Sequence, residues 1–418
     1  MRVLILAINY DPELTGLAPY TTAIAEHFVL KHQVRVLAGY PHYPSWRIDA
    51  NWAGMTVHRW RNGVLVTHLR HYVPKQQTAS RRALFECSWA LRALLGGTAS
   101  KRPDVIIAAV PNLLTGTVAQ LLAIRHRVPF GVITQDLVGV AAEQSGIAGG
   151  DRIASVAQAV ERSIFKRANG IVTIHDKLAR AIDQLYSPRC EVSVIRNWTH
   201  IEPPQLSKLA ARRKLGLPTD AFVVLHSGNM GLKQDLANVI HAARLLHTQG
   251  DQSTVFVFAG DGNQRASIEA AAADLPNVVL LGLVNARDYP AVLASADILL
   301  INERPGMNDM SAPSKLTSYL VAGRPIVAAT DEASATASYL RDTGAAIEVP
   351  AGSPKDIANV VRKLKNDHKL GETLANAGIA FATGQLDATR ALRAYDLWLN
   401  ALSEGRSVDQ DGGCEGVW

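Results

Sequence analysis

The stretch that decides the fold is FVVLHSGNMGLKQ, residues 222–234. It opens with an apolar run, 222–226, of strand length and passes through Gly228 and Gly231 toward a helical pattern. A continuous apolar strand followed by a helix is typical of a parallel sheet covered on both faces. The stretch therefore predicts the opening unit of a Rossmann-like domain, in which ligands bind at the carboxyl ends of the strands.

The same alternation of apolar runs and helical stretches extends through the chain on both sides of this stretch. Pro203-Pro204, the basic segment 208–214, Gly216 and Pro218 separate the two series and are typical of an interdomain linker. We therefore expect an α/β protein with two doubly wound, Rossmann-like domains that face each other across a cleft. The expected strands are residues 3–8, 34–38, 105–109, 130–134, 171–174 and 192–195 before the linker, and 222–226, 255–259, 278–281, 298–301, 326–329 and 346–349 after it.

The composition is that of a globular protein of two or three domains, with 418 residues of which 48% are apolar and 19% charged. No uncharged apolar run reaches the roughly 20 residues of a membrane-spanning helix. The apolar start, residues 1–10, lacks the basic flank and cleavage site of a signal peptide. Cys87, Cys190 and Cys414 are odd in number and widely spaced, which favours a reducing compartment. We therefore expect a cytoplasmic location.

Charge is divided unequally between the two halves of the chain. Residues 1–198 hold 23 Lys and Arg against 13 Asp and Glu, a net charge of +10, whereas residues 199–418 hold 20 against 24, a net charge of −4. The basic half is expected to face an anionic partner. Nucleic acid is one possible partner, but no aromatic-plus-basic binding motif is present, so we expect a phospholipid surface and no nucleic acid.

The segment SRRALFECSWALRALL, residues 80–95, is the candidate for that contact. It predicts a helix in which Trp89 and several leucines stand beside Arg81, Arg82 and Arg92. A basic amphipathic helix that carries Trp can lie in a membrane interface. The general alternative is a helix packed on the core with a solvated basic face; the charge of the first half favours the membrane.

The loop after the first expected strand, NYDPELTG at residues 9–16, argues against a nicotinamide enzyme. It lacks the G-x-G-x-x-G pattern, so a dinucleotide pyrophosphate has no close approach to the backbone. The backbone N–H groups of Thr15 and Gly16 can still reach a phosphate or sugar oxygen. An ordinary turn is an equal interpretation.

Two further positions in the first half carry polar groups after buried strands. Asp136 follows the strand expected at 130–134 and is a candidate catalytic residue at the cleft edge, or equally a loop cap. His175-Asp176 is interpreted as a helix cap in preference to a catalytic pair.

Three turns in the second half have groups suited to a phosphate. Gly228 and Lys233 offer backbone N–H groups and a positive charge after a strand. Gly-Asp-Gly at 260–262 ends a strand at the same edge, although a tight turn is the commoner meaning of that triplet. Ser314 and Lys315 follow a proline and mark a helix N-terminus, whose positive dipole end suits a diphosphate.

Together these residues carry a resemblance to glycosyltransferase family 4, most of all to the fucosyl- and N-acetylfucosaminyl-transferases of colanic acid and O-antigen synthesis. The matching stretches keep their order over almost the whole chain, which makes them far more specific than any one alone. They are NYDPELTG at 9–16, YPHYPSWR at 40–47, RNW at 196–198, SGNMGLKQ at 227–234, AGDG at 259–262 and PSKLTSYLVAGRPIVA at 313–328.

The resemblance implies a GT-B fold with an acceptor-binding domain over residues 1–200 and a nucleotide-sugar-binding domain over 201–385. A last helix, 386–402, would cross back to the first domain, and the polar tail 403–418 is expected to be disordered. Catalysis would involve Lys233, Asp136 and Gly16. The donor would contact Gly228, Asn229, Lys233, Asp261, Gly262, Leu283, Glu303, Asp309, Ser314, Lys315, Leu316 and Ser318.

The chain departs from the family pattern at two places. Asn229 stands where many members have a phosphate-binding arginine. The pair of glutamates that grips the donor ribose in many members is replaced by Met310 and Ser318. Asp309 or Glu303 is the expected substitute for the first carboxylate, and the Ser318 hydroxyl for the second.

The resulting expectation is a retaining, metal-independent glycosyltransferase without a cofactor. It would transfer a sugar, such as L-fucose or an N-acetylated amino sugar, from a GDP- or UDP-sugar to a glycan or polyprenyl-diphosphate-linked acceptor. Its place would be exopolysaccharide or lipopolysaccharide biosynthesis, on the inner face of the cytoplasmic membrane as a peripheral protein. The alternatives are a nucleotide-sugar epimerase of the same fold and a catalytically silent nucleotide-sugar-binding protein.

Overall fold

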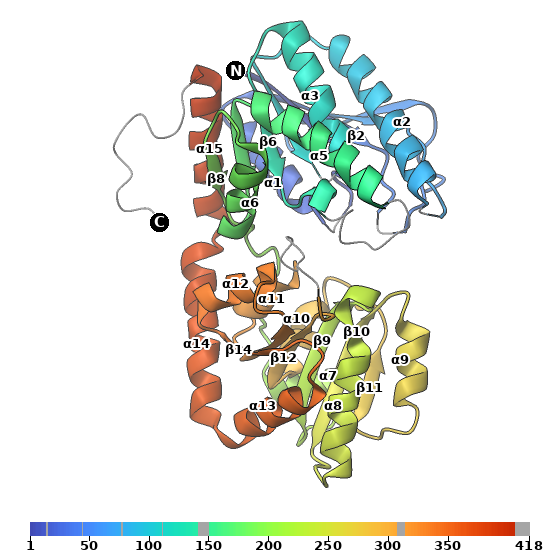
Figure 1. Ribbon diagram of the computed structural model, residues 1–418, viewed down its shortest axis with the longest axis vertical. Helices are drawn as coiled ribbons and strands as arrows, with labels where there is room; N and C mark the ends of the chain where they lie inside the picture. The colour runs from blue at the N-terminus through green and yellow to red at the C-terminus, as the bar shows by residue number, and fades with distance from the viewer. Residues whose placement is uncertain are drawn as a thin grey trace. The chain divides into compact units, whose positions relative to one another are not determined.

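The computed structural model describes residues 1–13, 16–43, 45–76, 78–110, 112–140, 150–306 and 314–405. The chain divides into two compact units, the first formed by Met1–Asn197 with Ala388–Trp418 and the second by Trp198–Asp387 (Figure 1). Each unit has its own sheet and its own core. The first boundary therefore lies three residues before the expected end of the first domain at residue 200.

The first unit contains an eight-stranded sheet in the order β3-β4-β2-β1-β5-β6-β7-β8. All neighbouring pairs are parallel except β3 and β4. The order changes direction at β1 and β5, which is the switch point where doubly wound sheets bind ligands. The strands are β1 (Arg2–Ala7), β2 (Gln33–Gly39), β3 (Thr56–Arg61), β4 (Val64–Leu69), β5 (Val105–Val110), β6 (Phe130–Thr134), β7 (Gly170–Thr173) and β8 (Val192–Val194).

The β3–β4 hairpin is absent from the strands expected from sequence. Its turn is Asn62-Gly63, with φ of 44° and 85°, the left-handed pair that a tight hairpin requires. Strand β3 is an edge strand and largely exposed, so it shows no apolar run. The Asn-Gly dipeptide was the available signal.

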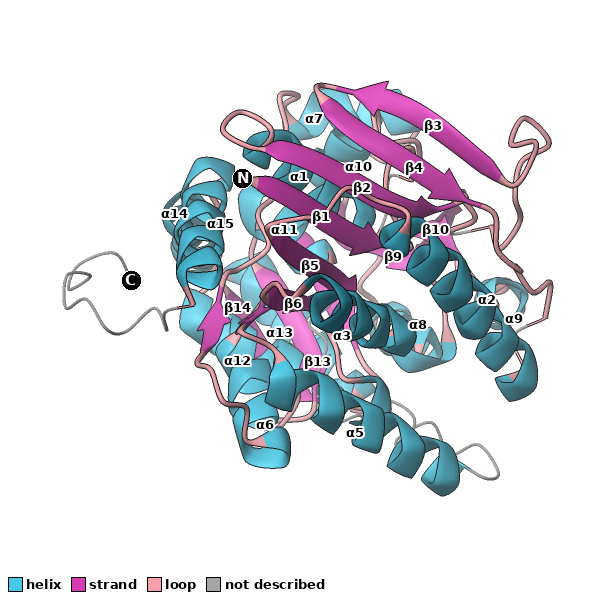
Figure 2. Ribbon diagram, turned by 90° about the horizontal axis from the view of Figure 1, so that it is seen from above, coloured by secondary structure: helices cyan, strands magenta, loops and turns pink. Residues whose placement is uncertain are grey.

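Helices cover both faces of this sheet, and α2, α3 and α5 lie side by side (Figures 1 and 2). Helix α1 carries a proline in its first turn, where the missing N–H has no partner to lose. The helices are α1 (Ala18–Phe28), α2 (Ala79–Thr98), α3 (Leu113–His126), α5 (Gly150–Arg167), α6 (Asp176–Tyr186) and α15 (Ala388–Glu404).

Helix α15 comes from the end of the chain and packs in the first unit. A Cβ on Gly131 or Gly170 would lie 2.5 or 2.8 Å from the Trp398 indole, so these two glycines make room for it. The carboxylate of Asp396 accepts a hydrogen bond from Lys31 at 2.7 Å. The helix continues through Glu404, so the expected start of the disordered tail at Ser403 is wrong; residues 406–418 of that tail lie outside the described residues.

The second unit contains a six-stranded parallel sheet in the order β11-β10-β9-β12-β13-β14. Its switch point lies between β9 and β12. Alternate residues of β9 belong to two cores, with Val223 and Leu225 on one face and Val224 on the other. The strands are β9 (Phe222–Asn229), β10 (Thr254–Asp261), β11 (Val278–Leu281), β12 (Ile298–Asn302), β13 (Ile326–Thr330) and β14 (Ala346–Pro350).

The segment expected to be a linker contains a helix that belongs to the second unit. In helix α7 the buried Arg212 forms an ion pair with Asp297 at 2.5 Å and donates to the Ser295 carbonyl at 2.9 Å. The basic run was therefore misinterpreted in part, because its acidic partners, Asp288 and Asp297, lie more than 70 residues away. The helical elements are α7 (Lys208–Leu215), η1 (Leu232–Gln234), α8 (Leu236–Thr248), α9 (Arg265–Ala272), α10 (Tyr289–Ser295), α11 (Lys315–Val321), α12 (Ala335–Thr343), α13 (Pro354–Asn366) and α14 (His368–Gln385).

Within the described part of the chain, every helix is too short or too polar to cross a bilayer.

Candidate functional site

The carboxyl ends of β9 and β10 form the glycine-lined edge of the second unit. Gly228 and Gly260 have φ of 112° and 144°. A Cβ on Gly260 would lie 2.0 Å from the Gly228 carbonyl oxygen, and one on Gly262 would lie 2.5 Å from the Met230 carbonyl oxygen. The two loops therefore approach backbone to backbone, which only glycine permits.

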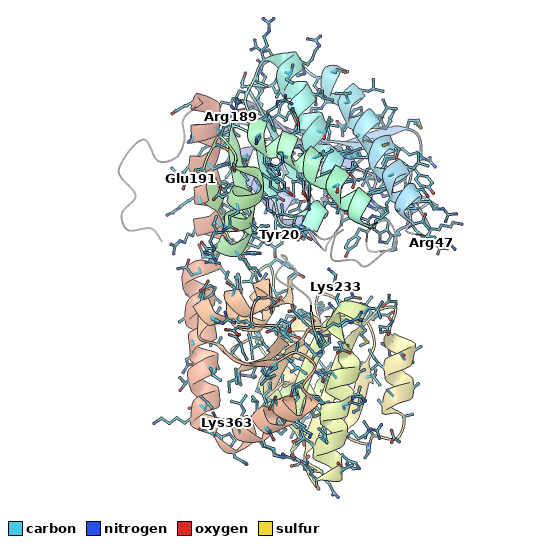
Figure 3. The ribbon with its side chains drawn as sticks, in the orientation of Figure 1. Tyr20, Arg47, Arg189, Glu191, Lys233 and Lys363 are labelled. Atoms are coloured by element: carbon cyan, nitrogen blue, oxygen red, sulfur yellow. The ribbon has the colours of Figure 1, made fainter. Side chains whose placement is uncertain are left out.

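Lys233 lies on the short helix η1 beside this edge, with its side chain exposed (Figure 3). The turn that carries it is fixed by Asn302, the last residue of β12, whose buried amide donates to the carbonyls of Gln234 at 2.9 Å and Asp235 at 3.0 Å. Asn302 was not singled out from sequence. A polar residue that ends an apolar strand at a switch point was the available signal.

Lys315 is the second cation at this edge. Its Nζ atom lies 3.4 Å from Nε2 of the buried His226, and a Cβ on Gly228 would lie 3.6 Å from the same Nζ atom. Burial lowers the pKa of Lys315 to about 7, an effect that the charge of Glu303 opposes. An anion at this place would favour the charged form of the amine.

The remaining predicted donor contacts differ in exposure. Asp261 and Asn229 are exposed and paired in register on neighbouring strands. Leu283 is exposed after β11, and Ser314 is exposed before α11. The side chains of Leu316 and Ser318 are buried, and Leu316 belongs to the core, so its side chain does not face the edge. Glu303 accepts a hydrogen bond from Thr336. Asp309 lies outside the described residues.

In the first unit, a buried carboxylate organises the loops after β1 and β2. Glu13 accepts hydrogen bonds from Asn9 at 2.7 Å and from the backbone N–H groups of His42 and Tyr43 at 2.7 and 2.8 Å. Gly16 has φ of 65°, and a Cβ there would lie 3.8 Å from the Tyr43 ring. The two loops therefore meet at the carboxyl edge of this sheet, and sequence interpretation did not single out Glu13 or His42.

Asp136 borders a small cavity that is also lined by Asn112, Thr134 and Glu161. One carboxylate oxygen of Asp136 accepts the backbone N–H of Leu137 at 2.8 Å, as a loop cap would. Glu161 accepts the Val138 N–H at 2.7 Å and the Tyr186 hydroxyl at 2.5 Å, and burial raises its pKa. The loop that carries Asp136 is thus held from beneath by a buried carboxylate.

His175 caps helix α6, because its Nδ1 atom accepts the Leu178 N–H at 3.1 Å. The helix-cap interpretation of His175-Asp176 is confirmed.

Helix α2 divides the residues that were assigned to a membrane contact. Trp89 is 0% exposed and donates to Thr115 at 2.9 Å, so its assignment to the membrane is wrong. It faces inward with Phe85 and Ala93, at the four-residue spacing of one helix face. Arg92 donates to the Met55 carbonyl and to the Thr56 hydroxyl, and so ties the helix to the start of β3.

The outer face of α2 still fits the expected membrane contact. Arg81 is exposed on this face; Arg82 is also exposed, but its guanidinium lies 5.5 Å from the Trp46 ring, on the side of the helix that carries Phe85. Leu84, Leu91 and Leu95 are 53%, 59% and 55% exposed and recur at the spacing of one helix face. The outer face is therefore both apolar and basic.

Among the described residues, no group of three or more His, Cys, Asp or Glu side chains is placed to hold a metal ion.

Comparison with known proteins matches each half of the chain to a glycosyltransferase family model. Residues 15–198 match the model of the glycosyl transferase 4-like domain, and residues 207–381 match that of glycosyl transferases group 1. The chain is 33% identical over 336 residues to the putative colanic acid biosynthesis glycosyl transferase WcaI of Escherichia coli K12, covering 77% of this chain and 82% of that protein.

Solved structures share the fold at lower identity. The Anabaena protein Alr3699/HepE in complex with UDP matches with a TM-score of 0.70 at 15% identity, over 96% of this chain and 100% of that one. WaaG, a glycosyltransferase involved in lipopolysaccharide biosynthesis, matches with a TM-score of 0.67 at 18% identity, over 94% of this chain and 99% of that one. The two Rossmann-like units are those of the GT-B fold, as expected from sequence.

Proposed function

The chain belongs to the glycosyltransferases of these two family models, and we propose that it transfers a sugar from a nucleotide-sugar to a glycan or lipid-linked acceptor in the synthesis of a cell-surface polysaccharide. The observation that carries the proposal is the glycine-lined edge of the second unit with Lys233 and Lys315 beside it. Membership of the family disfavours the epimerase alternative.

The donor in this proposal is a GDP- or UDP-sugar bound at the second unit. Its diphosphate would lie against the glycine-lined edge, beside the amino groups of Lys233 and Lys315. Support comes from the HepE structure, which was obtained with UDP. Leu283, exposed at the end of the neighbouring strand β11, is the proposed apolar contact for the nucleobase.

The proposed reaction is retaining and needs no metal ion. Departure of the nucleoside diphosphate leaves negative charge on its oxygen atoms, and two lysines at that place stabilise it electrostatically. The sugar of the proposal is L-fucose or an N-acetylated amino sugar. Asp136 is proposed to act near the anomeric carbon, although its hydrogen bond to Leu137 is that of a loop cap.

The acceptor in this proposal reaches the first unit from an anionic phospholipid surface. The outer face of α2 supports this, because three exposed leucines stand beside Arg81. The neighbouring helix α3 adds the exposed Leu121 and Ile124. The first 198 residues carry a net charge of +10. We therefore propose peripheral attachment at the inner face of the cytoplasmic membrane.

A screen of the full chain against GDP-, UDP- and dTDP-sugars tests the proposal. One class of donor should bind, and its slow hydrolysis should continue in excess EDTA. Binding without turnover of any donor, with acceptors supplied, would favour a silent nucleotide-sugar-binding protein. Loss of turnover on chelation and rescue by Mg²⁺ or Mn²⁺ would contradict metal independence.

A further inference from the structure

Trp46 adopts an unusual backbone conformation at the carboxyl edge of the first sheet. Its φ of 52° lies in the left-handed region, which a bulky side chain rarely adopts. Such a conformation costs of order 1–3 kcal/mol and persists only where the surroundings hold it. Residues of this kind cluster at sites that bind or react, so the contacts that hold Trp46 are informative.

Helix α2 holds Trp46 from one side. The ring centroids of Phe85 and Trp46 are 5.5 Å apart, and the guanidinium of Arg82 lies 5.5 Å from the Trp46 ring. The imidazole of His42 lies edge-on at 5.6 Å. These separations are those of favourable aromatic and cation–π contacts. The indole is therefore fixed in its orientation while the residue remains partly exposed.

Glu13 holds the same segment from beneath. Its buried carboxylate accepts the N–H groups of His42 and Tyr43 and the amide of Asn9. A buried carboxylate is tolerated only when such partners satisfy it, and it then rigidifies what it binds. Helix α2 and the Glu13 carboxylate, which come from separate parts of the sequence, thus fix the same short loop.

Two side chains of the same loop are exposed. Tyr43 is 41% exposed, its ring lies edge-on to Trp46 with centroids 6.4 Å apart, and Gly16 faces the same ring without a side chain. Arg47 is exposed next to Trp46 (Figure 3). The two rings lie in the loop after β2, at the carboxyl edge of the sheet, where doubly wound sheets bind their ligands.

We propose that Tyr43 and Trp46 form a platform for a pyranose ring of the acceptor. The C–H face of a pyranose is apolar and flat and packs against an aromatic ring, while its hydroxyl groups meet a polar margin such as Arg47. This deepens the proposed function and rests on it for the identity of the ligand as an acceptor. The rigidity of the platform lowers the entropic cost of binding.

The test measures binding of methyl glycosides of glucose, galactose, N-acetylglucosamine and L-fucose to the full chain by saturation-transfer difference NMR. At least one glycoside should bind, and Trp46→Ala should weaken it about tenfold, because Trp is a dominant residue in binding sites. Trp46→Phe should keep most of the affinity. The matched control is Trp60→Ala, since Trp60 is 72% exposed on β3 and should leave binding unchanged.

Titration with UDP and GDP separates this idea from the proposed function. Every variant should bind the nucleoside diphosphate as the parent does, because the second unit is unchanged, and an unchanged far-UV circular dichroism spectrum shows that the first unit still folds. Failure of the parent to bind any nucleotide would count against the proposed function alone. Unchanged glycoside binding by Trp46→Ala, equal loss in Trp60→Ala, or no glycoside bound by the parent would overturn the platform.

Discussion

The two units have the same kind of sheet and finish its carboxyl edge in different ways. In the second unit, Gly228 and Gly260 bring two loops together backbone to backbone, and Lys233 and Lys315 stand beside them. In the first unit, the buried carboxylate of Glu13 clamps an aromatic loop. The carboxyl edge of the sheet is therefore glycine-lined and cationic in the second unit, whereas in the first unit it is rigid and aromatic. The two units therefore differ in function because their sites differ, although their folds are alike.

Removing the charge at the second edge is the strongest way to test that contrast. Lys233→Ala should lower turnover by at least about 10²-fold, because the departing diphosphate loses an electrostatic partner. The measurement is steady-state turnover with the donor found in the screen. The matched control is Lys363→Ala on α13, an exposed lysine of the same unit (Figure 3). Near-normal turnover in Lys233→Ala would end its assignment to the leaving group.

The outer face of α2, in the first unit, is the expected site of membrane attachment. Replacing Leu84, Leu91 and Leu95 together with Ser should reduce sedimentation with anionic liposomes at least about tenfold, since each leucine loses the gain of burial in the interface. Binding by the parent should also fall at high salt. Leu397→Ser on α15, an equally exposed leucine, is the control. Liposome binding that survives the triple change would assign the face to another partner.

Rigidity at the first edge can be tested with Glu13→Gln. The amide nitrogen of Gln is a donor and opposes the Asn9 amide, so the free energy of unfolding should fall by about 1–3 kcal/mol. Urea unfolding gives the value, and nucleoside diphosphate binding should remain. The exposed ion pair of Glu26 with Arg61 offers the control Glu26→Gln, expected within about 0.5 kcal/mol of the parent. Equal effects of the two changes would contradict the clamp.

The second edge should respond to pH through Lys315. Burial holds its folded pKa at about 7, well below the usual lysine value, and His226 and Glu303 are the titratable groups that face it. The unfolded chain therefore binds more protons above pH 7, so this group makes the fold more stable as pH rises from 7 toward 10.4. An anionic diphosphate favours the charged amine, so its affinity should fall as pH rises above 7.

Calorimetry of UDP or GDP binding between pH 7.5 and 9 checks this dependence. In buffers of different ionisation enthalpy, binding should take up part of a proton, and affinity should fall by up to about tenfold per pH unit. Lys315→Arg keeps the charge at all these values and should remove the trend. A parent without proton uptake would show that Lys315 is already charged before the ligand arrives.

Periodicity was sufficient for most of the scaffold. The apolar runs at 222–226 and 298–301 became β9 and β12, because a strand buried on both faces shows as a continuous apolar run. The hairpin of β3 and β4 escaped, since an exposed edge strand has no such run. The sequence also predicted that Lys233 lies beside the sheet edge, because this residue follows an expected strand.

The face of a helix was harder to predict. Trp89 was grouped with the leucines of residues 80–95, whereas it packs inside against Thr115. Both faces of that helix are rich in apolar residues, so its sequence alone left two orientations. Only the neighbouring helix α3 decides which face is covered.

What the sequence by itself determined was two Rossmann-like domains, the family, and a cation after the first strand of the second domain. What only the tertiary structure decided was which distant side chains meet. Glu13 finds His42 across 29 positions, and Arg212 finds Asp297 across 85. The reason is physical: periodicity records how often a side chain is buried, whereas a hydrogen bond or a ring contact depends on which loops the packed sheet brings together.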